Sequence, residues 1–308
     1  MASQSSSPAQ DALLKPDSVL PAGIHLKPAA RKRGFSWSKA IFYTLIIIFM
    51  LNLFGMVGSV IVDSFGHTWY ASWLPTGGYS NEWYTFLAND QDIGQLISNT
   101  LIVAIASTLL ALLLGFPASY VLARREFRFK GALTALYMVP LLMPTLAYGI
   151  PLATLLSQID LGGLLGSSLI NVIVINVVPI LPFVILILTP FIEQIDVSLE
   201  SASRMLGANR FQTFMRIVLP LILPGVLTAG VLAIVRTIAM FELTFLVSDA
   251  NSSTLVVSLF GQAFGAGIRP TQEIDAMAVI YTATTMALMV IALIFVKPTQ
   301  FVVRLKSQ

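Results

Sequence analysis

The residues of this sequence that could do chemistry gather in two places. One is a polar stretch, ESASRMLGANRFQTFMRIVLPLILPG, which runs from Glu200 to Gly225 between long apolar blocks. The other is the pair Arg236 and Glu242, which lies inside a further apolar block. Charged residues placed among apolar ones are costly, so each is a candidate for a functional role.

No catalytic constellation accompanies these residues. His25 lies near the N-terminus and His67 in a predicted outer loop, and neither belongs to a His/Asp/Ser set. The chain has no cysteine, which excludes thiolate metal sites and disulfides. It also lacks the G-x-x-x-x-G-K-[ST] loop that cradles phosphates. We therefore predict no catalytic residue, no metal site and no ATP site, and hence that the chain is not an enzyme.

The polar stretch is predicted to begin with a short amphipathic helix. Its apolar positions recur at helical spacing and form one stripe: Ile195, Leu199, Ala202 and Leu206. Its polar residues lie off that stripe: Glu200, Ser203 and Arg204. Gly207 then permits a turn that bulkier residues would resist.

A second short helix is expected after this turn. Asn209 followed by Gln212 is a variant of the capping box that starts helices. The apolar residues expected on one side of this helix are Phe211, Phe214, Met215 and Val218. Pro220 and Pro224 are expected in the first turns of the next span, where the missing N–H of a proline costs least. Such a pair either rests on lipid headgroups or docks a cytosolic partner, and the residues alone favour neither.

The two intramembrane charges cannot pair along one helix face. Six residues separate Arg236 from Glu242, which is about 240° around a helix. Each would need a partner on another helix, on a second subunit or in water. Tyr148, Asn171 and Asn176 are further polar residues within spans, where holding helices together is their commoner role. The candidate pathway residues are Tyr148, Asn176, Arg236 and Glu242.

Composition places the chain in a membrane. Of its 308 residues, 56% are hydrophobic and 11% are charged, against about 25% charged in soluble domains. A helix that spans a bilayer needs about 20 apolar residues. Barrel strands would instead alternate in ten-residue segments, so an all-α fold is expected. The predicted spans are Ala40–Val62, Ile97–Ala123, Ala132–Leu156, Leu169–Ile192, Ile217–Val247 and Ala276–Val296.

The basic residues orient these six spans. Every Lys and Arg except Arg236 and Arg269 falls on one side, which the positive-inside rule makes cytoplasmic, together with both termini and the polar stretch. This placement by topology gives no reason to expect a nucleic-acid partner. The expected organisation is a disordered tail (1–38), a first span with its external loop (39–93), a core (94–297) and a C-terminal tail (298–308).

Prolines gather in the third and fourth predicted spans. Interior prolines remove a backbone hydrogen bond and kink helices. Most of them have an ordinary role in shaping helix packing, but their clustering suggests a bent pair that lines a cavity. The prolines are Pro140, Pro144, Pro151, Pro179, Pro182 and Pro190.

The polar stretch resembles the cytoplasmic loop of the membrane permeases of binding-protein-dependent ABC importers (type I). That family's pattern is Glu-Ala-Ala, three residues, Gly, nine residues, then Ile-x-Leu-Pro. Here Ser201-Ala202-Ser203 occupies the first slot, Gly207 matches, and Ile217 to Pro220 closes the pattern. Ser201 replaces the glutamate, and Glu200 stands one residue earlier. The likeness covers roughly residues 94 to 296, with upstream matches at Asn99-Thr100-Leu101, Gly115, Pro117, Tyr120, Arg124, Gly131, Pro140 and Pro144.

The resemblance implies coupling helices that sit in a cleft of a cytosolic ABC ATPase dimer, which binds ATP and Mg²⁺ itself. It also implies a second permease subunit, a periplasmic or extracellular solute-binding protein, and a place in the bacterial inner membrane among lipid. Met205, Leu206 and Phe211 are the expected apolar knob, with Arg204 and Arg210 as rim charges. The full set of coupling residues is Glu200, Ser201, Ala202, Arg204, Met205, Leu206, Gly207, Arg210 and Phe211.

The outer loops give a hint about the cargo. They are acidic apart from Arg269, and acidic rims concentrate cations. The first outer loop carries Trp83-Tyr84, which is similar to an element of the polyamine branch of the family. A polyamine is the first expectation for the cargo, followed by sugars or phosphonate-like solutes. An ion-coupled secondary transporter is the alternative of another class.

Overall fold

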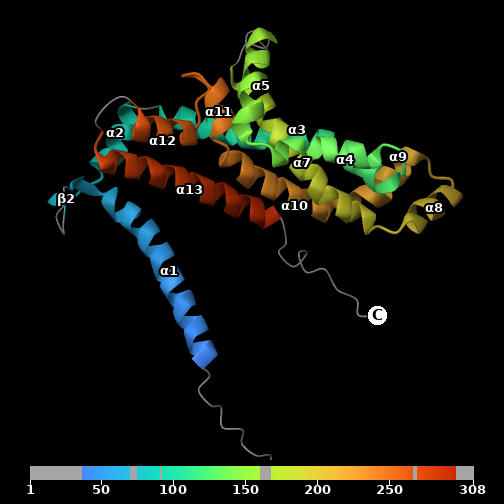
Figure 1. Cartoon of the computed structure of the whole chain (residues 1–308), viewed down its shortest axis with the longest axis horizontal. Helices are drawn as coiled ribbons and strands as arrows, with labels where there is room; N and C mark the ends of the chain where they lie inside the picture. Colours follow the sequence, from blue (N-terminus) through green and yellow to red (C-terminus); the bar gives the residue numbers. More distant parts are fainter. Residues whose placement is uncertain (1–36, 70–74, 91, 160–167, 266–268, 296–308) are drawn as a thin grey trace, which may run out of the picture. The chain divides into compact units, whose positions relative to one another are not determined.

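A computed structural model describes residues 37–69, 75–90, 92–159, 168–265 and 269–295 (Figure 1). The predicted tails, 1–38 and 298–308, lie almost wholly outside these residues. The chain forms two compact units, which meet between Leu53 and Phe54. Of the first unit, the structure describes the beginning of helix α1 (Trp37–Asp63), where the described side chains are exposed. Everything below concerns the second unit.

Among the residues that the structure describes, five helices are long and apolar enough to span a membrane, and a bent pair makes a sixth candidate span. The five are α1, α3 (Ile93–Arg124), α7 (Leu169–Glu193), the continuous stretch Arg210–Ile238 and α13 (Thr271–Phe295). The prediction of an all-α membrane fold with six spans is confirmed in its main lines.

The third predicted span is two helices. α4 (Lys130–Leu142) and α5 (Thr145–Ile159) meet at 97°. In Figure 1, α5 stands out from the line of α3, α4 and α7. The reason is local: Met143 is extended, as a residue before a proline prefers to be, and Pro144 follows it. The sequence predicted that prolines interrupt the span Ala132–Leu156, and the bend lies at one of them, Pro144.

The fourth predicted span is one continuous helix, unlike the bent third span. α7 stays one helix from Leu169 to Glu193 although it contains Pro179, Pro182 and Pro190. More than half of its apolar stretch is buried, so surrounding helices hold it in place where backbone hydrogen bonds are missing. The expected pair of bent spans is therefore one sharply bent span beside one continuous helix.

The fifth predicted span starts earlier and ends earlier than expected. Helix α9 (Arg210–Thr213), a π-helical turn η2 (Phe214–Val218) and α10 (Leu219–Ile238) follow one another without a break. The chain then leaves the helix, and α11 (Glu242–Val247) begins separately. The predicted bounds Ile217–Val247 were therefore wrong at both ends.

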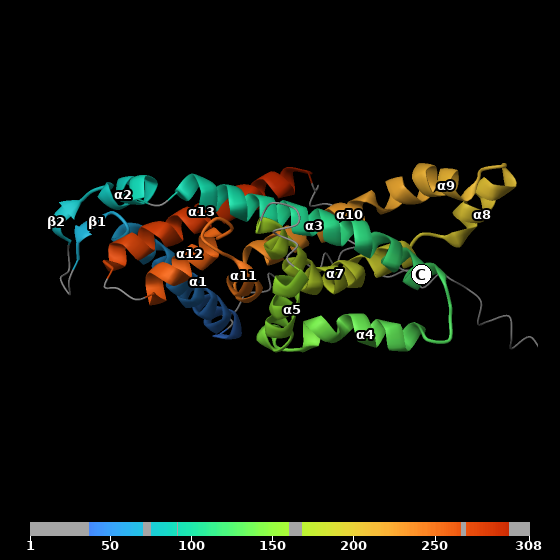
Figure 2. The ribbon, with the colours of Figure 1, turned by 90° about the horizontal axis from the view of Figure 1, so that it is seen from above.

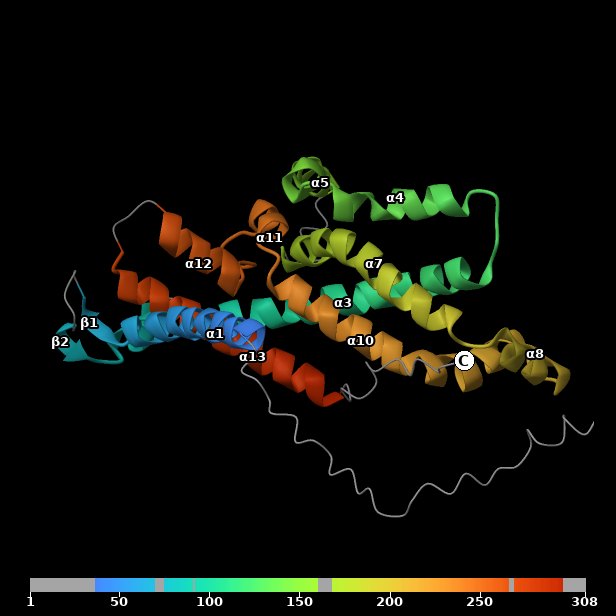
Figure 3. The same cartoon turned by 60° about the horizontal axis from the view of Figure 1, so that its bottom comes forward.

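The core of the unit is formed by α3, α7 and α10, which lie side by side in Figures 2 and 3. Small residues let these helices approach closely. A Cβ at Gly115 would lie 2.9 Å from Val184, and one at Gly225 would lie 2.7 Å from the Phe191 ring. The buried side chains of this cluster are Ala111, Val177, Ile180, Val184, Leu188, Ala229 and Ala233.

The far end of the unit carries elements that the sequence did not predict. Strands β1 (Gly66–Thr68) and β2 (Thr76–Tyr79) form an antiparallel hairpin in which Gly66 pairs with Tyr79 and Thr68 with Thr76. Helices α2 (Glu82–Asp90) and α12 (Leu255–Phe264) pack against α3 and α13. Figures 1 and 2 show the hairpin at one end and helix α8 (Val197–Met205) at the other.

Candidate functional site

Helix α8 has its polar side turned toward the protein and its apolar side turned away. Glu200 and Ser203 are 4% and 6% exposed, whereas Met205 and Leu206 are 83% and 89% exposed. Of the predicted apolar stripe, Leu199, Ala202 and Leu206 are exposed, and only Ile195 is half-buried. Exposed large apolar side chains that adjoin one another are typical of an interaction surface.

Glu200 fixes α8 to the end of α3. Its carboxylate accepts hydrogen bonds from Tyr120 Oη at 2.8 Å and Arg124 Nε at 3.0 Å. Arg204 Nη2 lies 3.6 Å from the same carboxylate. Arg124 also donates to the Ile195 carbonyl at 2.8 Å. A buried carboxylate needs such partners, so Glu200 forms an ion pair although it stands outside the family slot, which Ser201 fills.

Ser201 and Ala202, which fill the family's first slot, are exposed on α8. Ser201 Oγ donates to the Val197 carbonyl of its own helix at 3.2 Å. At the start of α8, the Ser198 N–H donates to Asp196 at 2.8 Å and holds the pKa of that carboxyl below its usual value. This cap therefore stays ionised at neutral pH.

Gly207 makes the predicted turn. Its φ is +89°, a region that glycine enters readily. Its N–H donates to the Arg204 carbonyl and that of Ala208 donates to the Ser203 carbonyl, at 3.0 and 3.1 Å. These two bonds form a Schellman motif, which satisfies the last carbonyls of α8. No heavy atom lies within 4 Å of a Cβ built at Gly207, so the backbone alone selects glycine here.

The second arm of the loop starts as predicted and continues differently. Asn209 and Gln212 form a full capping box, with bonds of 2.8 and 3.0 Å. Ser203 Oγ and Thr213 Oγ1 lie 2.8 Å apart and join the two arms. However, α9 runs directly into η2 and α10, so it is not a separate short helix. The coupling candidates of this arm, Arg210 and Phe211, are both exposed.

The apolar residues predicted for one side of this arm divide between two sides. Val218 is fully buried and Phe214 packs edge-on against the Tyr120 ring, whereas Phe211 is 68% exposed. The arm therefore has an inner anchor and an outward apolar residue. A displacement of Phe211 would pass along a continuous helix into the membrane.

The candidate pathway residues Tyr148, Asn176, Arg236 and Glu242 lie one each on α5, α7, α10 and α11. Asn176 is fully buried, and its Nδ2 donates to Thr244 Oγ1 of α11 at 3.0 Å. Its Oδ1 has no hydrogen-bond partner among the described residues. Tyr148 packs on the apolar cluster of Ile175, Met240, Leu243 and Leu156. Tyr148 also interacts electrostatically with both Arg236 and Glu242.

Arg236 and Glu242 lie on two different helices, so the predicted angle of 240° between them does not apply. The break after Ile238 separates them. The Arg236 guanidinium lies 5.1 Å from the centre of the Phe183 ring, a cation–π distance, and its Nε has no hydrogen-bond partner among the described residues. Within the described part of the chain, neither charge forms an ion pair.

Several structural contacts of this unit were not foreseen. Asn99 Nδ2 donates to the carbonyls of Asn251 and Ser253 at 2.8 and 2.9 Å, and Thr100 Oγ1 accepts from the Leu255 N–H at 2.9 Å. These bonds tie α3 to the loop before α12. The α3 partners of Glu200 could have been found from the sequence, since Tyr120 and Arg124 are four residues apart and therefore lie on one face of the helix.

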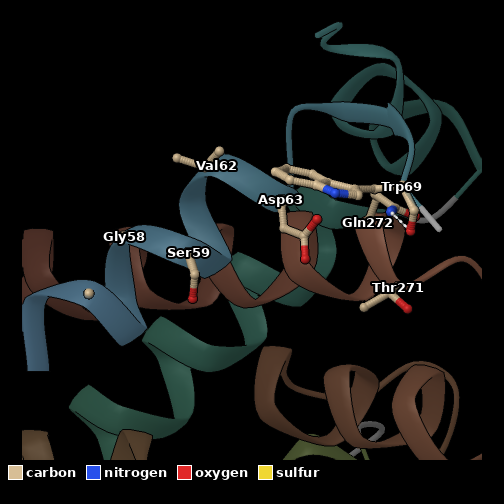
Figure 4. A pocket seen from close by; sticks show the side chains of 8 residues that line it. Gly58, Ser59, Val62, Asp63, Trp69, Thr271 and Gln272 are labelled. Atoms are coloured by element: carbon tan, nitrogen blue, oxygen red, sulfur yellow. Dashed lines mark hydrogen bonds between the residues drawn. The ribbon is translucent and has the colours of Figure 1, made fainter. Parts of the chain in front are cut away.

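A hollow of about 560 Å³ lies between the end of α1 and the start of α13 (Figure 4). Asp63 and Trp69 line it, and Gln272 Nε2 donates to the Trp69 carbonyl at 3.3 Å. Nearby, His67 of β1 forms a hydrogen bond with Glu82, the first residue of α2. Asp63 is one of the acidic residues that the sequence assigned to the outer face.

Known proteins give a consistent comparison. Residues 111–298 match the family described as "Binding-protein-dependent transport system inner membrane component". The spermidine/putrescine transport system permease protein PotC of Escherichia coli (strain K12) is 26% identical over 269 residues, 87% of this chain and 92% of the relative. The molybdate/tungstate permease WtpB of Thermococcus kodakarensis is 30% identical over 205 residues, 66% of this chain and 78% of the relative.

A solved structure agrees on the fold. It is a bacterial ABC transporter involved in the import of the acidic polysaccharide alginate, and the matched chain is 18% identical. The TM-score is 0.68, over 85% of this chain and 98% of the other. At this identity the likeness bears on the fold alone.

Proposed function

Because the chain belongs to the family of binding-protein-dependent transport system inner membrane components, we propose that it forms half of a solute pathway and is coupled to a cytosolic ABC ATPase through α8 and Gly207. The matched family is a transport component, and ATP hydrolysis belongs to a separate subunit. The family depends on binding proteins, so the alternative of an ion-coupled secondary transporter is set aside.

The reversed polarity of α8 carries this proposal. A short helix that rested on its own protein would bury Met205 and Leu206 and expose Glu200, and the opposite arrangement is observed. Burying an exposed leucine in a partner surface contributes about 2 kcal/mol. Glu200, Ser203 and the Schellman turn hold α8 rigid from behind, which a helix that transmits motion requires.

The proposal is tested by placing a charge on this surface. Leu206→Asp should abolish co-purification of the ATPase and ATP-driven uptake in vesicles, while membrane insertion and thermal stability stay unchanged, because the side chain is 89% exposed. The matched control is Phe129→Asp, in the loop before α4, where the side chain is 69% exposed. Full coupling in Leu206→Asp would contradict the proposal.

We propose the remaining assembly from the family and the sequence. The termini and α8 lie on the cytosolic side, and a second permease, identical or different, completes the pathway. A solute-binding protein delivers cargo from outside to the end of the unit that carries β1, β2 and Asp63. The chain itself binds no cofactor, and the partner ATPase binds ATP and Mg²⁺.

The proposed cargo is a small polar solute, with polyamines as the first class to test. The acidic outer loops and the length of the PotC match support this choice. An oxyanion is the second candidate, because Arg236 is an intramembrane cation without an ion pair in the described chain and a relative carries molybdate or tungstate in its name. Glu242 would then attract a cationic cargo and Arg236 an anionic one.

A further inference from the structure

A basic pocket of about 490 Å³ lies between the end of α3 and the two arms around Gly207. Four arginines and one carboxylate line it: Arg124, Arg125, Arg204, Arg210 and Glu200. Glu200 is engaged by Arg124 and Arg204. Arg125 and Arg210 form no ion pair with any residue that the structure describes. The pocket therefore has an excess of positive charge, which fits an anion.

The pocket stands at the membrane boundary. α3 is a spanning helix that ends at Arg124, and Arg125 is the residue that follows it. The rest of the pocket wall is aromatic and apolar, with Tyr120, Phe214 and Val197. Basic and aromatic residues at the end of a spanning helix are typical of the level of lipid headgroups.

An apolar groove of about 400 Å³ lies between α3, α4 and α7. Val121 of the groove and Arg124 of the pocket are three residues apart on α3, a spacing that places two side chains close together on a helix. Val121 and Leu133 of the groove are 47% and 44% exposed, so the groove is open on one side. The groove-lining residues are Pro117, Ala118, Val121, Leu122, Leu133, Tyr137 and Ile185.

We propose that the pocket and the groove together bind one anionic phospholipid, with its phosphate among the arginines and an acyl chain in the groove. Arginine forks match phosphate oxygens in pairs, and basic pockets between spanning helices bind anionic headgroups. The groove favours a lipid over a free phosphate or an acidic side chain of a partner protein, since those have no acyl chain to place there. The phosphate stabilises the arginines that also hold Glu200, so the lipid supports α8 from behind.

The test is native mass spectrometry of the purified full-length chain titrated with phosphatidylglycerol and, in parallel, with phosphatidylcholine. Wild type should retain phosphatidylglycerol preferentially. Arg125→Gln should weaken that retention by roughly five-fold, the contribution of one basic residue near an anionic surface. The matched control is Arg128→Gln: Arg128 is also an exposed arginine of this loop, does not line the pocket, and should bind as wild type does.

Two further experiments identify the ligand. Leu133→Trp narrows the groove without touching an arginine and should also lower retention of phosphatidylglycerol. Inorganic phosphate at millimolar concentration should not displace the lipid. Equal retention by Arg125→Gln and Arg128→Gln would overturn the proposal, as would displacement by phosphate. Unchanged lipid binding together with a loss of ATPase co-purification in Arg125→Gln would assign the pocket to the partner protein instead.

Discussion

At the scale of single residues, the loop is held by a few buried polar groups whose outward neighbours are apolar. Glu200 is 4% exposed and has three partners from two helices, so it is a structural anchor of α8. Removing one partner of a buried ion pair costs about 3–5 kcal/mol, because the other charge stays buried alone. The position next to it, Ser201, is exposed. The anchor and the proposed coupling surface are thus formed by separate residues of one helix.

Gly207→Val should uncouple ATP hydrolysis from transport while expression is kept. A left-handed backbone costs an L-residue roughly 1–2 kcal/mol, and a branched side chain tolerates it least. The Schellman bonds that end α8 would then be lost. The measurement is solute transported per ATP hydrolysed. Gly207→Asn is the control, since asparagine accepts this conformation. Normal coupling in the valine variant would count against the role of the turn.

At the scale of elements, close helix packing rather than hydrogen bonding holds α7 and α10 together. A Cβ at Gly225 would lie 2.7 Å from Phe191 Cγ and 3.0 Å from its Cβ, so even one methyl group forces the Phe191 side chain or one of the two helices to shift. Gly131, at the start of α4, has open space around it. Substituting alanine at these two glycines therefore separates the effect of helix packing from that of intrinsic helix preference.

Gly225→Ala should destabilise the purified protein by about 1–3 kcal/mol, the usual effect of overpacking. Gly131→Ala should be neutral or stabilise by up to about 1 kcal/mol, because alanine is the better helix former. Thermal unfolding in detergent, followed for both variants beside wild type, measures the difference. The same change in both would show that contact with Phe191 does not limit the approach of α7 and α10.

The sequence predicts an element well where hydropathy sets its bounds, and poorly where contacts with distant residues set its bend or its buried side. The first, second, fourth and sixth spans begin and end close to their predicted residues. Hydropathy cannot show that Pro144 turns α5 by 97°, since a kinked and a broken helix have the same composition. Nor can periodicity say which side of α8 faces inward, because a helix of nine residues has a polar and an apolar side in either case. The partners of Glu200, 76 and 80 positions away, decide that.

At the scale of the whole molecule, the residues proposed for the solute pathway come from four helices, α5, α7, α10 and α11. Asn176 of α7 donates a hydrogen bond to Thr244 of α11, and Arg236 and Glu242 lie within electrostatic range of Tyr148 of α5. Among the described residues Arg236 and Glu242 form no ion pair, so under the proposed function either charge could attract cargo. The sign of the cargo charge decides which of them matters.

For a polyamine cargo, Glu242→Gln should lower uptake by about ten-fold and Arg236→Gln should not, because the lost carboxylate is the group that attracts a cation. For molybdate or tungstate the order should reverse. Uptake by vesicles with the cognate binding protein outside and ATP inside measures both. If both variants retained full uptake of every cargo tested, neither charge would belong to the pathway.

The most direct test of the coupling role is a cross-link from the tip of α8. The chain has no cysteine, so Leu206→Cys carries a single thiol, to which a photoactivated cross-linker can be attached in membranes that contain the whole transporter. We predict an adduct with the ATPase subunit that strengthens or weakens on addition of ATP, and none from Phe264→Cys at the end of α12, where the side chain is also exposed. A thiol at position 206 that reacts from outside the cell, or that attaches to lipid alone in the intact transporter, would contradict this account.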